Sequence, residues 1–411
     1  MLCRLKRSVP VIATLALALA IAGCNSDPNA GAAKAGRPGV IKIVSSLPRT
    51  GSANAQTTTV VNGIRMAIDE VGGKVGDFTI EYEDWDDATP QKGAWDPAVE
   101  ASNAERAVKD PDVMAYIGTY NSGAAKISMP VLNQASLLMV SPANTAVGLT
   151  KKGGQANEPL VYRPSGKVTY FRVVPADDIQ GRVAADWAKD LGAKSVFILH
   201  DREVYGKGIA DIFRQHAKDI GLEELGYEGI DTKAANYRSL AAKIAGTGAD
   251  LVYFGGTTQS NAGQMAKDLR SAGYNKPFMV PDGCFENAFV EAGGPDNLNG
   301  TTYVTFGGVP PDKLTGKGAE FYKNYVEKYK AEPESYAVYG YEAAKAALHG
   351  IAQAKKKDRA AIVEAVSKIK DFDGALGTWS FDENGDTTLT TMSGQTVADG
   401  KFKFVKVLGG K

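Results

Sequence analysis

Hydrophobic and polar residues alternate along this chain in blocks that predict strands and helices in turn. Unbroken apolar runs are typical of buried strands, and apolar residues spaced three and four apart are typical of helices. The run at 40–45 fits the first pattern, and the spacing at 60–71 fits the second. Further strands are predicted at 78–82, 113–117 and 137–140, with helices at 99–108 and 124–134.

Two polar loops follow neighbouring predicted strands and bring possible ligand contacts together. Ser122 follows the strand at 113–117, and Thr145 follows the strand at 137–140. A helical crossover makes such strands parallel, so both loops lie at the carboxyl edge of the sheet, where α/β folds bind ligands. The Ser122-Gly123 pair offers a hydroxyl and free N–H groups that suit a carboxylate or phosphate. The alternative is that Ser122 only caps the helix.

After a polar segment at 151–167, the same alternation begins again. Polar or aromatic residues again follow the predicted strands, which indicates a second α/β unit. The chain of 411 residues is also longer than a usual single domain. Helices are predicted at 182–191, 207–220 and 237–245, with strands at 195–200, 250–254 and 277–281. A further helix is predicted after the strand at 250–254 and ends at 272.

The last third of the chain changes to a mostly helical pattern. Helices are predicted at 319–330, 336–354 and 359–369, between a strand at 301–306 and two short strands at 378–381 and 402–407.

The first 38 residues have the pattern of an export signal followed by a tether. A basic start precedes an apolar run that is too short to span a bilayer and ends at Gly23-Cys24. This predicts a signal peptide at 1–23, with Cys24 as a lipidated first residue of the mature chain. The alternative is an ordinary signal peptide cleaved elsewhere. Residues 24–38 are rich in Ala, Gly, Asn and Pro and predict a flexible tether.

Charge and composition exclude several classes of partner. Lys and Arg number 47, as do Asp and Glu, so no nucleic-acid partner is expected. The three Cys and three His have no zinc spacing, and the acidic run at 83–87 lacks the spacing of a calcium loop, so no metal is predicted. No Gly-x-Ser-x-Gly elbow, Walker motif or full dinucleotide fingerprint is present, which argues against an enzyme and against a cofactor.

The order and spacing of six segments resemble the periplasmic leucine/isoleucine/valine-binding proteins of ABC transporters. The segments are IGTYNSGAAK, LLMVSPANTAVGLT, ILHDREVYGKG, VYFGGTTQSNAGQMAKDLRSAGY, FMVPDG and YAVYGYEAAKAAL. The resemblance implies an α/β fold with two Rossmann-like lobes, parallel-sheet cores and three crossovers, the type I periplasmic-binding or Venus-flytrap fold. Lobe one would be 39–172 plus 305–376, and lobe two 173–304 plus 377–411.

The same resemblance implies which residues bind the ligand. Ser122, Thr145 and the backbone of Ala143 would hold the carboxylate and ammonium of an amino acid, and Asp282 would hold the ammonium. Tyr205 and Tyr336 would line the cleft from opposite sides.

Departures from the family pattern concern the ligand's side chain. Gln56 and Thr257 occupy positions where the family has enclosing aromatic residues, and Asp282 replaces a glutamate. Recognition of the amino-acid head group is therefore the firmer expectation, although a branched-chain or similar aliphatic ligand fits the resemblance.

The resulting hypothesis is a monomeric, extracytoplasmic lipoprotein that delivers an amino acid to an ABC permease. The alternative is a sensor lipoprotein of the same fold, for an amide or small carboxylate, that signals to a receptor.

Overall fold

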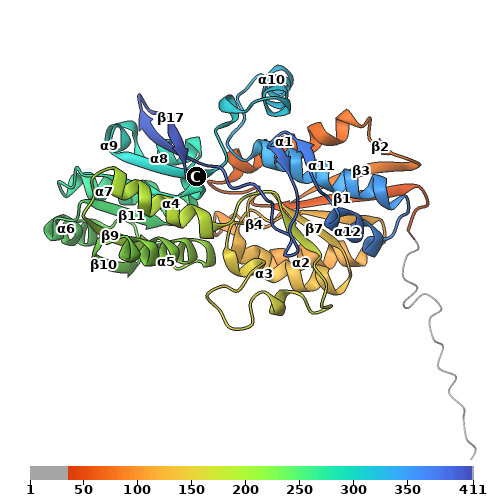
Figure 1. The fold of residues 1–411 in the computed structure, drawn as a ribbon, viewed down its shortest axis with the longest axis horizontal. Coiled ribbons are helices and arrows are strands. Elements are labelled where there is room, and N and C mark those ends of the chain that lie inside the picture. The colour runs from red at the N-terminus through yellow and green to blue at the C-terminus, as the bar shows by residue number, and fades with distance from the viewer. Residues whose placement is uncertain (1–35, 410–411) are drawn as a thin grey trace, which may run out of the picture. The chain divides into compact units, whose positions relative to one another are not determined.

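The computed structural model describes residues 36–409, which form two α/β lobes, each built around one large sheet (Figure 1). Lobe one has six strands in the order β2-β3-β1-β6-β7-β8, all parallel except β2. The strands are β2 (Lys74–Val75), β3 (Phe78–Asp86), β1 (Val40–Leu47), β6 (Val113–Gly118), β7 (Leu138–Ser141) and β8 (Tyr170–Arg172).

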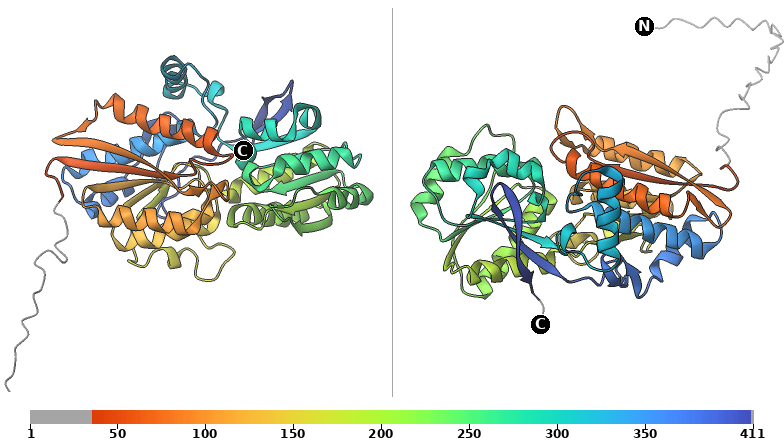
Figure 2. Two further views of the ribbon diagram at one scale, coloured as in Figure 1. Left: turned by 180° about the vertical axis from the view of Figure 1, so that it is seen from behind. Right: turned by 90° about the horizontal axis from the view of Figure 1, so that it is seen from above.

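Alternating side chains of these strands bury against helices on both faces of the sheet. Ile41 and Ile43 of β1 pack with the helices α1 (Asn54–Glu70), α11 (Ala337–Ala354) and α12 (Arg359–Ser367). Val44 packs on the opposite face with α2 (Pro97–Lys109) and α3 (Ser122–Gln134). Helices from the end of the chain thus complete the lobe formed by its beginning, and Figure 2 shows them beside α1 and β1.

Two glycines let α1 and α11 pack closely in lobe one. A Cβ on Gly63 would lie 2.2 Å from the carbonyl oxygen of Ala337, and one on Gly340 would lie 2.4 Å from that of Val60. The two helix backbones are therefore in direct contact near their N-terminal halves. This contact places the start of α1, with Gln56, beside the start of α11, with Tyr336.

Lobe two has seven strands in the order β10-β9-β11-β12-β13-β16-β17. Its first five strands are parallel, as predicted for the core, and the last two add an antiparallel edge. The strands are β10 (Glu223–Gly229), β9 (Ser195–His200), β11 (Leu251–Gly255), β12 (Phe278–Val280), β13 (Thr302–Gly307), β16 (Met392–Ala398) and β17 (Lys401–Leu408).

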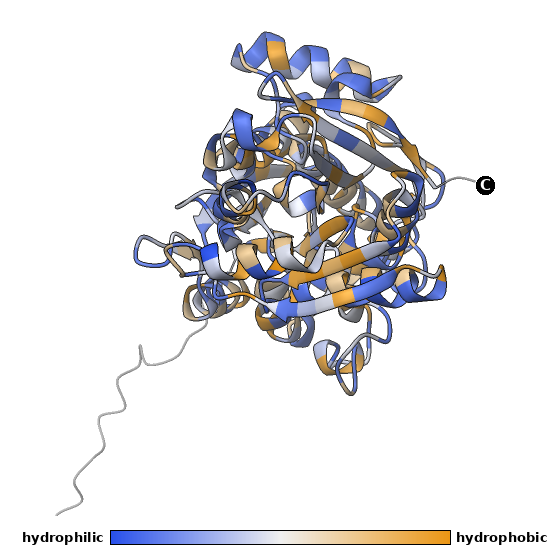
Figure 3. Ribbon diagram, turned by 90° about the vertical axis from the view of Figure 1, so that its left-hand side faces the viewer, coloured by the Kyte–Doolittle hydropathy of each residue, from blue (hydrophilic) through white to orange (hydrophobic). Residues whose placement is uncertain are grey.

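Helices also cover both faces of the second sheet. Ile198 and Tyr253 face the helices α4 (Asp177–Asp190) and α5 (Val204–Asp219). Phe197 and Phe254 face α6 (Arg238–Thr247), α7 (Ala262–Ser271) and α8 (Asn287–Gly293). Figure 3 shows the same arrangement as hydrophobic residues along the inner strands and hydrophilic residues on the loops and outer helix surfaces.

The chain passes between the sheets after β8, after β13 and between β15 (Gly377–Trp379) and β16. The predicted second crossing at Thr305 lies inside β13, which stays paired with β16 up to Gly307. The predicted third crossing at Gly377 lies in a short hairpin of β14 (Phe372–Gly374) and β15. A strand ends where its hydrogen bonds to the neighbouring strand end, and the apolar pattern of the sequence did not mark where the pairing of these strands ends.

A buried ion pair ties the first crossing to the third. The guanidinium of Arg172, which is fully buried, donates from Nε to Asp386 at 2.7 Å and from Nη1 to the carbonyl oxygens of Asn144 and Ala146. Burial raises the pKa of Asp386, but the charge and hydrogen bond of Arg172, together with the charge of Lys151, outweigh it and hold the pKa at about 2. The loop containing Thr145 is therefore fastened to the hinge region.

Several elements extend beyond the predicted ranges because their ends are polar. The helix α1 begins at Asn54 rather than at 60, α4 at Asp177 rather than at 182, and α5 at Val204 rather than at 207. The strands β10 and β16 were not predicted, because EELGYEG and MSGQTVA lack an apolar run. Between residues 36 and 409, no helix is long and apolar enough to cross a membrane.

Candidate functional site

Asp282 lies where the two lobes meet, directly after β12 in lobe two. The hydroxyl of Tyr336, the N-cap residue of α11 in lobe one, donates a hydrogen bond to its Oδ2. Tyr205 in the first turn of α5 donates to Oδ1 at 2.5 Å, and Gln180 of α4 donates to Oδ1 at 2.8 Å. Three donors from three helices thus fix one carboxylate at the boundary between the lobes.

The carboxylate of Asp282 keeps capacity for one more donor. A carboxylate has about four lone-pair positions, and the three side-chain donors occupy two on Oδ1 and one on Oδ2. Asp282 is 2% exposed, and burial raises its pKa, while the hydrogen bonds from Tyr205, Tyr336 and Gln180 lower it. A ligand cation at Oδ2 would add the charge partner that a buried carboxylate otherwise lacks.

A second buried carboxyl group, that of Asp177, lies near Asp282. Asp177, in the first turn of α4, is 1% exposed, and neither of its oxygens has a hydrogen-bond partner within residues 36–409. Burial raises its pKa well above the usual range, and the nearby charge of Asp282 raises it further. A cation placed beside these two acids would lower both pKa values, so the pair favours a cationic group near Asp282.

The start of α3 faces the same region from lobe one. The N-cap of α3 is Asn121, whose side chain makes no capping bond, so Ser122 is the first helical residue and not the cap. The Ser122 hydroxyl accepts from the backbone N–H of Ala146 at 3.3 Å and keeps its own proton for donation. In residues 36–409, no acceptor is bonded to the backbone N–H of Ser122 or Gly123. These donors at a helix N-terminus suit an anion.

A small cavity joins most of the residues that the sequence predicted. Ser122, Ala143, Tyr205, Thr257, Asp282 and Tyr336 all line it, together with Tyr120, Asn121 and Gly283.

Tyr205 precedes the helix predicted at 207–220 but lies in the first turn of α5, because that helix begins at Val204. Thr145 and Gln56 do not line the cavity. Thr145 lies beside Asp177, whose backbone N–H donates to the Thr145 carbonyl at 2.9 Å.

Gln56 joins the lobes instead of lining the cavity. Its side chain is fully buried and donates to Ser335 Oγ at 3.0 Å and to the carbonyl oxygen of Phe285 in lobe two at 3.4 Å. The backbone N–H of Tyr336 donates to Gln56 Oε1 at 3.0 Å. The resemblance assigned Gln56 to a ligand-enclosing position, whereas in the structure its amide hydrogen-bonds to groups of both lobes and does not line the cavity at Asp282.

Sequence reasoning missed Tyr120, Asn121 and Gln180. Tyr120 and Asn121 stand immediately before Ser122 in the same strand-end loop, so their position was a usable signal. No signal in the sequence pointed to Gln180, because the apolar pattern predicted that the helix α4 begins after this residue. Its amide donates to Asp282 and accepts from the hydroxyl of Thr305 at 2.9 Å and the backbone N–H of Asp282 at 3.0 Å.

The space beside Asp282 is too small for an amino acid as it stands. The cavity at Asp282 measures about 20 Å³, and an adjoining cavity measures about 80 Å³. One water needs roughly 10–15 Å³ and small-molecule sites are typically about 300–1,000 Å³. A ligand of that size therefore enters only when the lobes separate.

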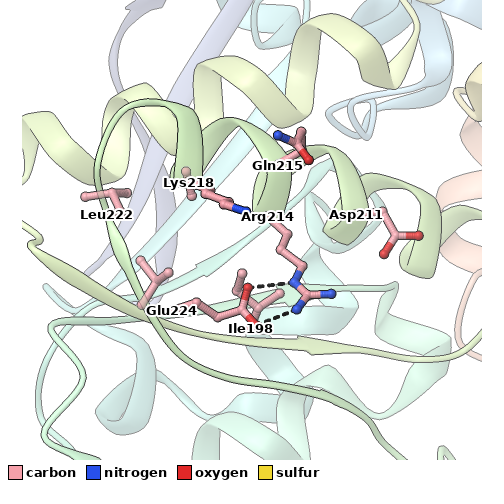
Figure 4. Close-up of a pocket in the computed structure, with 9 residues that line it drawn as sticks. Ile198, Asp211, Arg214, Gln215, Lys218, Leu222 and Glu224 are labelled. Atoms are coloured by element: carbon pink, nitrogen blue, oxygen red, sulfur yellow. Dashed lines mark hydrogen bonds and ion pairs between the residues drawn. The ribbon is translucent and has the colours of Figure 1, made fainter.

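A larger groove on the outside of lobe two does not have the features of a ligand site. It measures about 650 Å³ and runs along α5 and β10, where Figure 4 shows Arg214 paired with Glu224. Both side chains are exposed, and none of its lining side chains is buried with an unsatisfied polar atom.

Within residues 36–409, no group of His, Cys, Asp and Glu could hold a metal ion.

Comparisons with known proteins identify the family of the chain. The family model for periplasmic binding proteins matches residues 40–401. An amino acid binding protein of Pseudomonas aeruginosa is 29% identical over 350 residues, which cover 84% of this chain and 86% of that protein. A Leu/Ile/Val-binding protein homolog of Brucella abortus is 28% identical over 372 residues, which cover 89% of this chain and 93% of that protein.

Solved structures give the same result for the fold. A leucine binding protein from Thermotoga maritima superimposes with a TM-score of 0.79 at 26% identity, covering 90% of this chain and 99% of that one. A branched-chain amino acid transporter substrate binding protein from Streptococcus pneumoniae, in complex with isoleucine, gives 0.77 at 26% identity, with 90% and 99% covered.

Proposed function

The chain belongs to the periplasmic binding protein family, and we propose that it binds a small amino acid between its lobes and delivers it to an ABC importer. The family and fold are those of solute-binding proteins rather than enzymes, and they place the chain outside the cytoplasm. The names of the relatives, which describe amino-acid-binding proteins, also support the proposal.

One observation carries the assignment of an α-amino-acid ligand. A buried carboxylate with one free acceptor position, Asp282, lines the same small cavity as Ser122 at the N-terminus of α3. An amino acid carries an ammonium and a carboxylate on one carbon, and these match the acceptor on Asp282 and the donors at Ser122 that line the cavity. In this proposal Asp282 receives the ammonium, Ser122 and the Ala143 carbonyl contact the head group, and Thr145 supports their loop.

Closure of the lobes completes the site. Contacts already cross between the lobes at Tyr336–Asp282, Gln56–Phe285 and Glu334–Asn287. In the proposed cycle these contacts break to admit ligand and form again around it, as in other hinged binding proteins. We keep the two predicted lobes but place the second crossing after Gly307 and the third beyond Trp379.

Anchoring at Cys24 is a further part of the proposal. It rests on the apolar run before Gly23-Cys24, which lies outside the described residues. The lipid would hold the protein on the membrane that contains its permease, and the tether at 24–38 would give it reach. We propose that the protein works as a monomer.

A thermal-shift panel of amino acids, amides and small carboxylates tests the proposed function. A ligand at about one hundred times its dissociation constant stabilises the protein by roughly 2.7 kcal/mol. The expected result is a rise in Tm with at least one α-amino acid and none with its deaminated analogue. A rise only with compounds that lack an α-amino group would contradict the proposal.

A further inference from the structure

Two amides meet across the lobes next to the head-group cavity. Asn121, the N-cap residue of α3 in lobe one, donates from Nδ2 to Oε1 of Gln259 in lobe two at 3.2 Å. Gln259 lies in the short helix η3 (Thr258–Ser260) that follows β11. The two other amide atoms, Asn121 Oδ1 and Gln259 Nε2, are buried and have no hydrogen-bond partner within residues 36–409.

This arrangement leaves one acceptor and one donor whichever way the amides are oriented. If both amides are turned over, Gln259 donates to Asn121, and the free atoms become a donor on Asn121 and an acceptor on Gln259. In both orientations the pair offers one N–H and one carbonyl oxygen on neighbouring side chains. Leaving such buried atoms unpaired costs free energy, so they favour a ligand group that pairs with both.

The cavity beside this pair continues the head-group cavity. It measures about 80 Å³ and shares Asn121, Ser122, Tyr205 and Thr257 with the cavity at Asp282. Its lobe-two wall is polar, because Ser260 Oγ lies 3.1 Å from Thr257 Oγ1 and donates to Asp201 at 2.6 Å.

Trp95 also lines this cavity. It ends the hairpin of β4 (Ala88–Thr89) and β5 (Ala94–Trp95). The indole lies so close to α3 that a Cβ on Gly123 would be 2.7 Å from it. The space therefore has one flat aromatic wall and several hydrogen-bonding side chains.

We propose that this cavity holds the side chain of the ligand and selects an amino acid whose side chain ends in a carboxamide. The inference rests on the proposed function, because the head group must sit at Asp282 for its side chain to reach Asn121 and Gln259. A carboxamide has one carbonyl acceptor and an NH₂ donor, so it pairs with both free atoms in either orientation. A carboxylate cannot donate, and an ammonium cannot accept.

Calorimetric titration of the mature protein with asparagine, glutamine and leucine tests the inference. Asparagine and leucine have nearly the same shape, so their comparison isolates the hydrogen bonds, and glutamine allows for a longer reach. Burying an amide atom without a partner weakens binding by about tenfold or more. We expect the better amide to bind at least tenfold more tightly than leucine, and Gln259→Leu to remove that preference, so that the amide and leucine bind the variant within about threefold of each other.

A matched control and a second variant keep the test decisive. Gln215→Leu makes the same chemical change on the exposed face of α5, where Gln215 bonds only to Asp219, and should leave all three affinities unchanged. Asn121→Leu should repeat the effect of Gln259→Leu from the other lobe. If leucine binds the wild type as tightly as both amides, the carboxamide inference fails while the proposed function stands. If no α-amino acid binds, both fail together.

Discussion

The hydroxyl of Tyr336 in lobe one donates a hydrogen bond to Asp282 in lobe two. Tyr336 is the N-cap residue of α11, and Asp282 follows β12, so the bond joins residues 54 positions apart on opposite sides of the site. Both side chains are 2% exposed. A tyrosine that helps to hold the proposed ammonium site thus also reports whether the lobes are closed.

Tyr336→Phe should weaken ligand binding by roughly tenfold to a hundredfold, because a hydrogen bond to a charged group contributes about 1.5–3 kcal/mol. Calorimetry with the ligand found by thermal shift measures this change. Tyr341→Phe is the matched control on the same helix, since the Tyr341 hydroxyl bonds to Glu70 within lobe one. Equal losses in the two variants would show that the Tyr336 contact has no special role in the site.

Gln56→Leu should loosen the closed arrangement without changing which ligand is preferred. The Gln56 amide bonds to Ser335, to the backbone N–H of Tyr336 and to Phe285, and leucine can replace none of these bonds. We expect all amino-acid ligands to weaken by a similar factor of about ten or more. A change in the order of ligand affinities would instead place Gln56 against the ligand's side chain.

The fold could be predicted because it depends on apolar strands and the helices between them, whereas most residues of the proposed site were assigned through the family resemblance. Ser122, Ala143 and Asp282 come after such strands, and the structure gathers them around one cavity with Tyr205, Thr257 and Tyr336. The short motifs around these residues, together with their order, were enough to identify the family.

The remaining parts depend on pairings that no local pattern encodes. Gln56 and Gln180 lie in the polar first turns of α1 and α4, and both act through residues more than one hundred positions away. The pairing of Asn121 with Gln259 requires two lobes to meet. Strand β16 contains few apolar residues and was missed, because its place beside β13 is set by the ladder and not by its own composition.

Stability should fall as pH rises through neutrality, because buried acids hold protons in the folded chain. Glu286 is 1% exposed with one unpaired oxygen, and burial raises its pKa to about 8. A carboxyl group whose pKa is higher in the folded chain than in the unfolded chain contributes its full stabilisation below the unfolded pKa of about 4.3. That contribution to the free energy of unfolding is lost as pH rises towards 8. Each pH unit in that window costs about 1.4 kcal/mol for this group.

Glu286→Gln should therefore make the free energy of unfolding less dependent on pH between 5 and 7.5. Denaturant unfolding at several pH values should show a slope reduced by about 1.4 kcal/mol per pH unit relative to the wild type. Glu364→Gln is the matched control, because Glu364 is exposed on α12 and pairs with Lys368. An unchanged slope in Glu286→Gln would mean that this carboxyl is ionised in the folded protein at neutral pH.

Cys24→Ser should release the protein from membranes while leaving ligand affinity unchanged. The substitution removes the thiol that would carry the lipid, and the tether separates this position from the lobes. Fractionation of cells that express each form measures the distribution. If the variant still pellets with membranes, Cys24 is not the anchor.

Asp282→Ala tests the central claim most directly, in calorimetric titrations with the preferred amino acid and its deaminated analogue. Removing one partner of a buried charge pair costs about 3–5 kcal/mol, so the amino acid should bind roughly two to four decades more weakly. The analogue should bind the wild type poorly and lose little further in the variant, because it has no ammonium to pair. If Asp282→Ala binds the amino acid within threefold of the wild type, the ammonium site is elsewhere and the account is wrong.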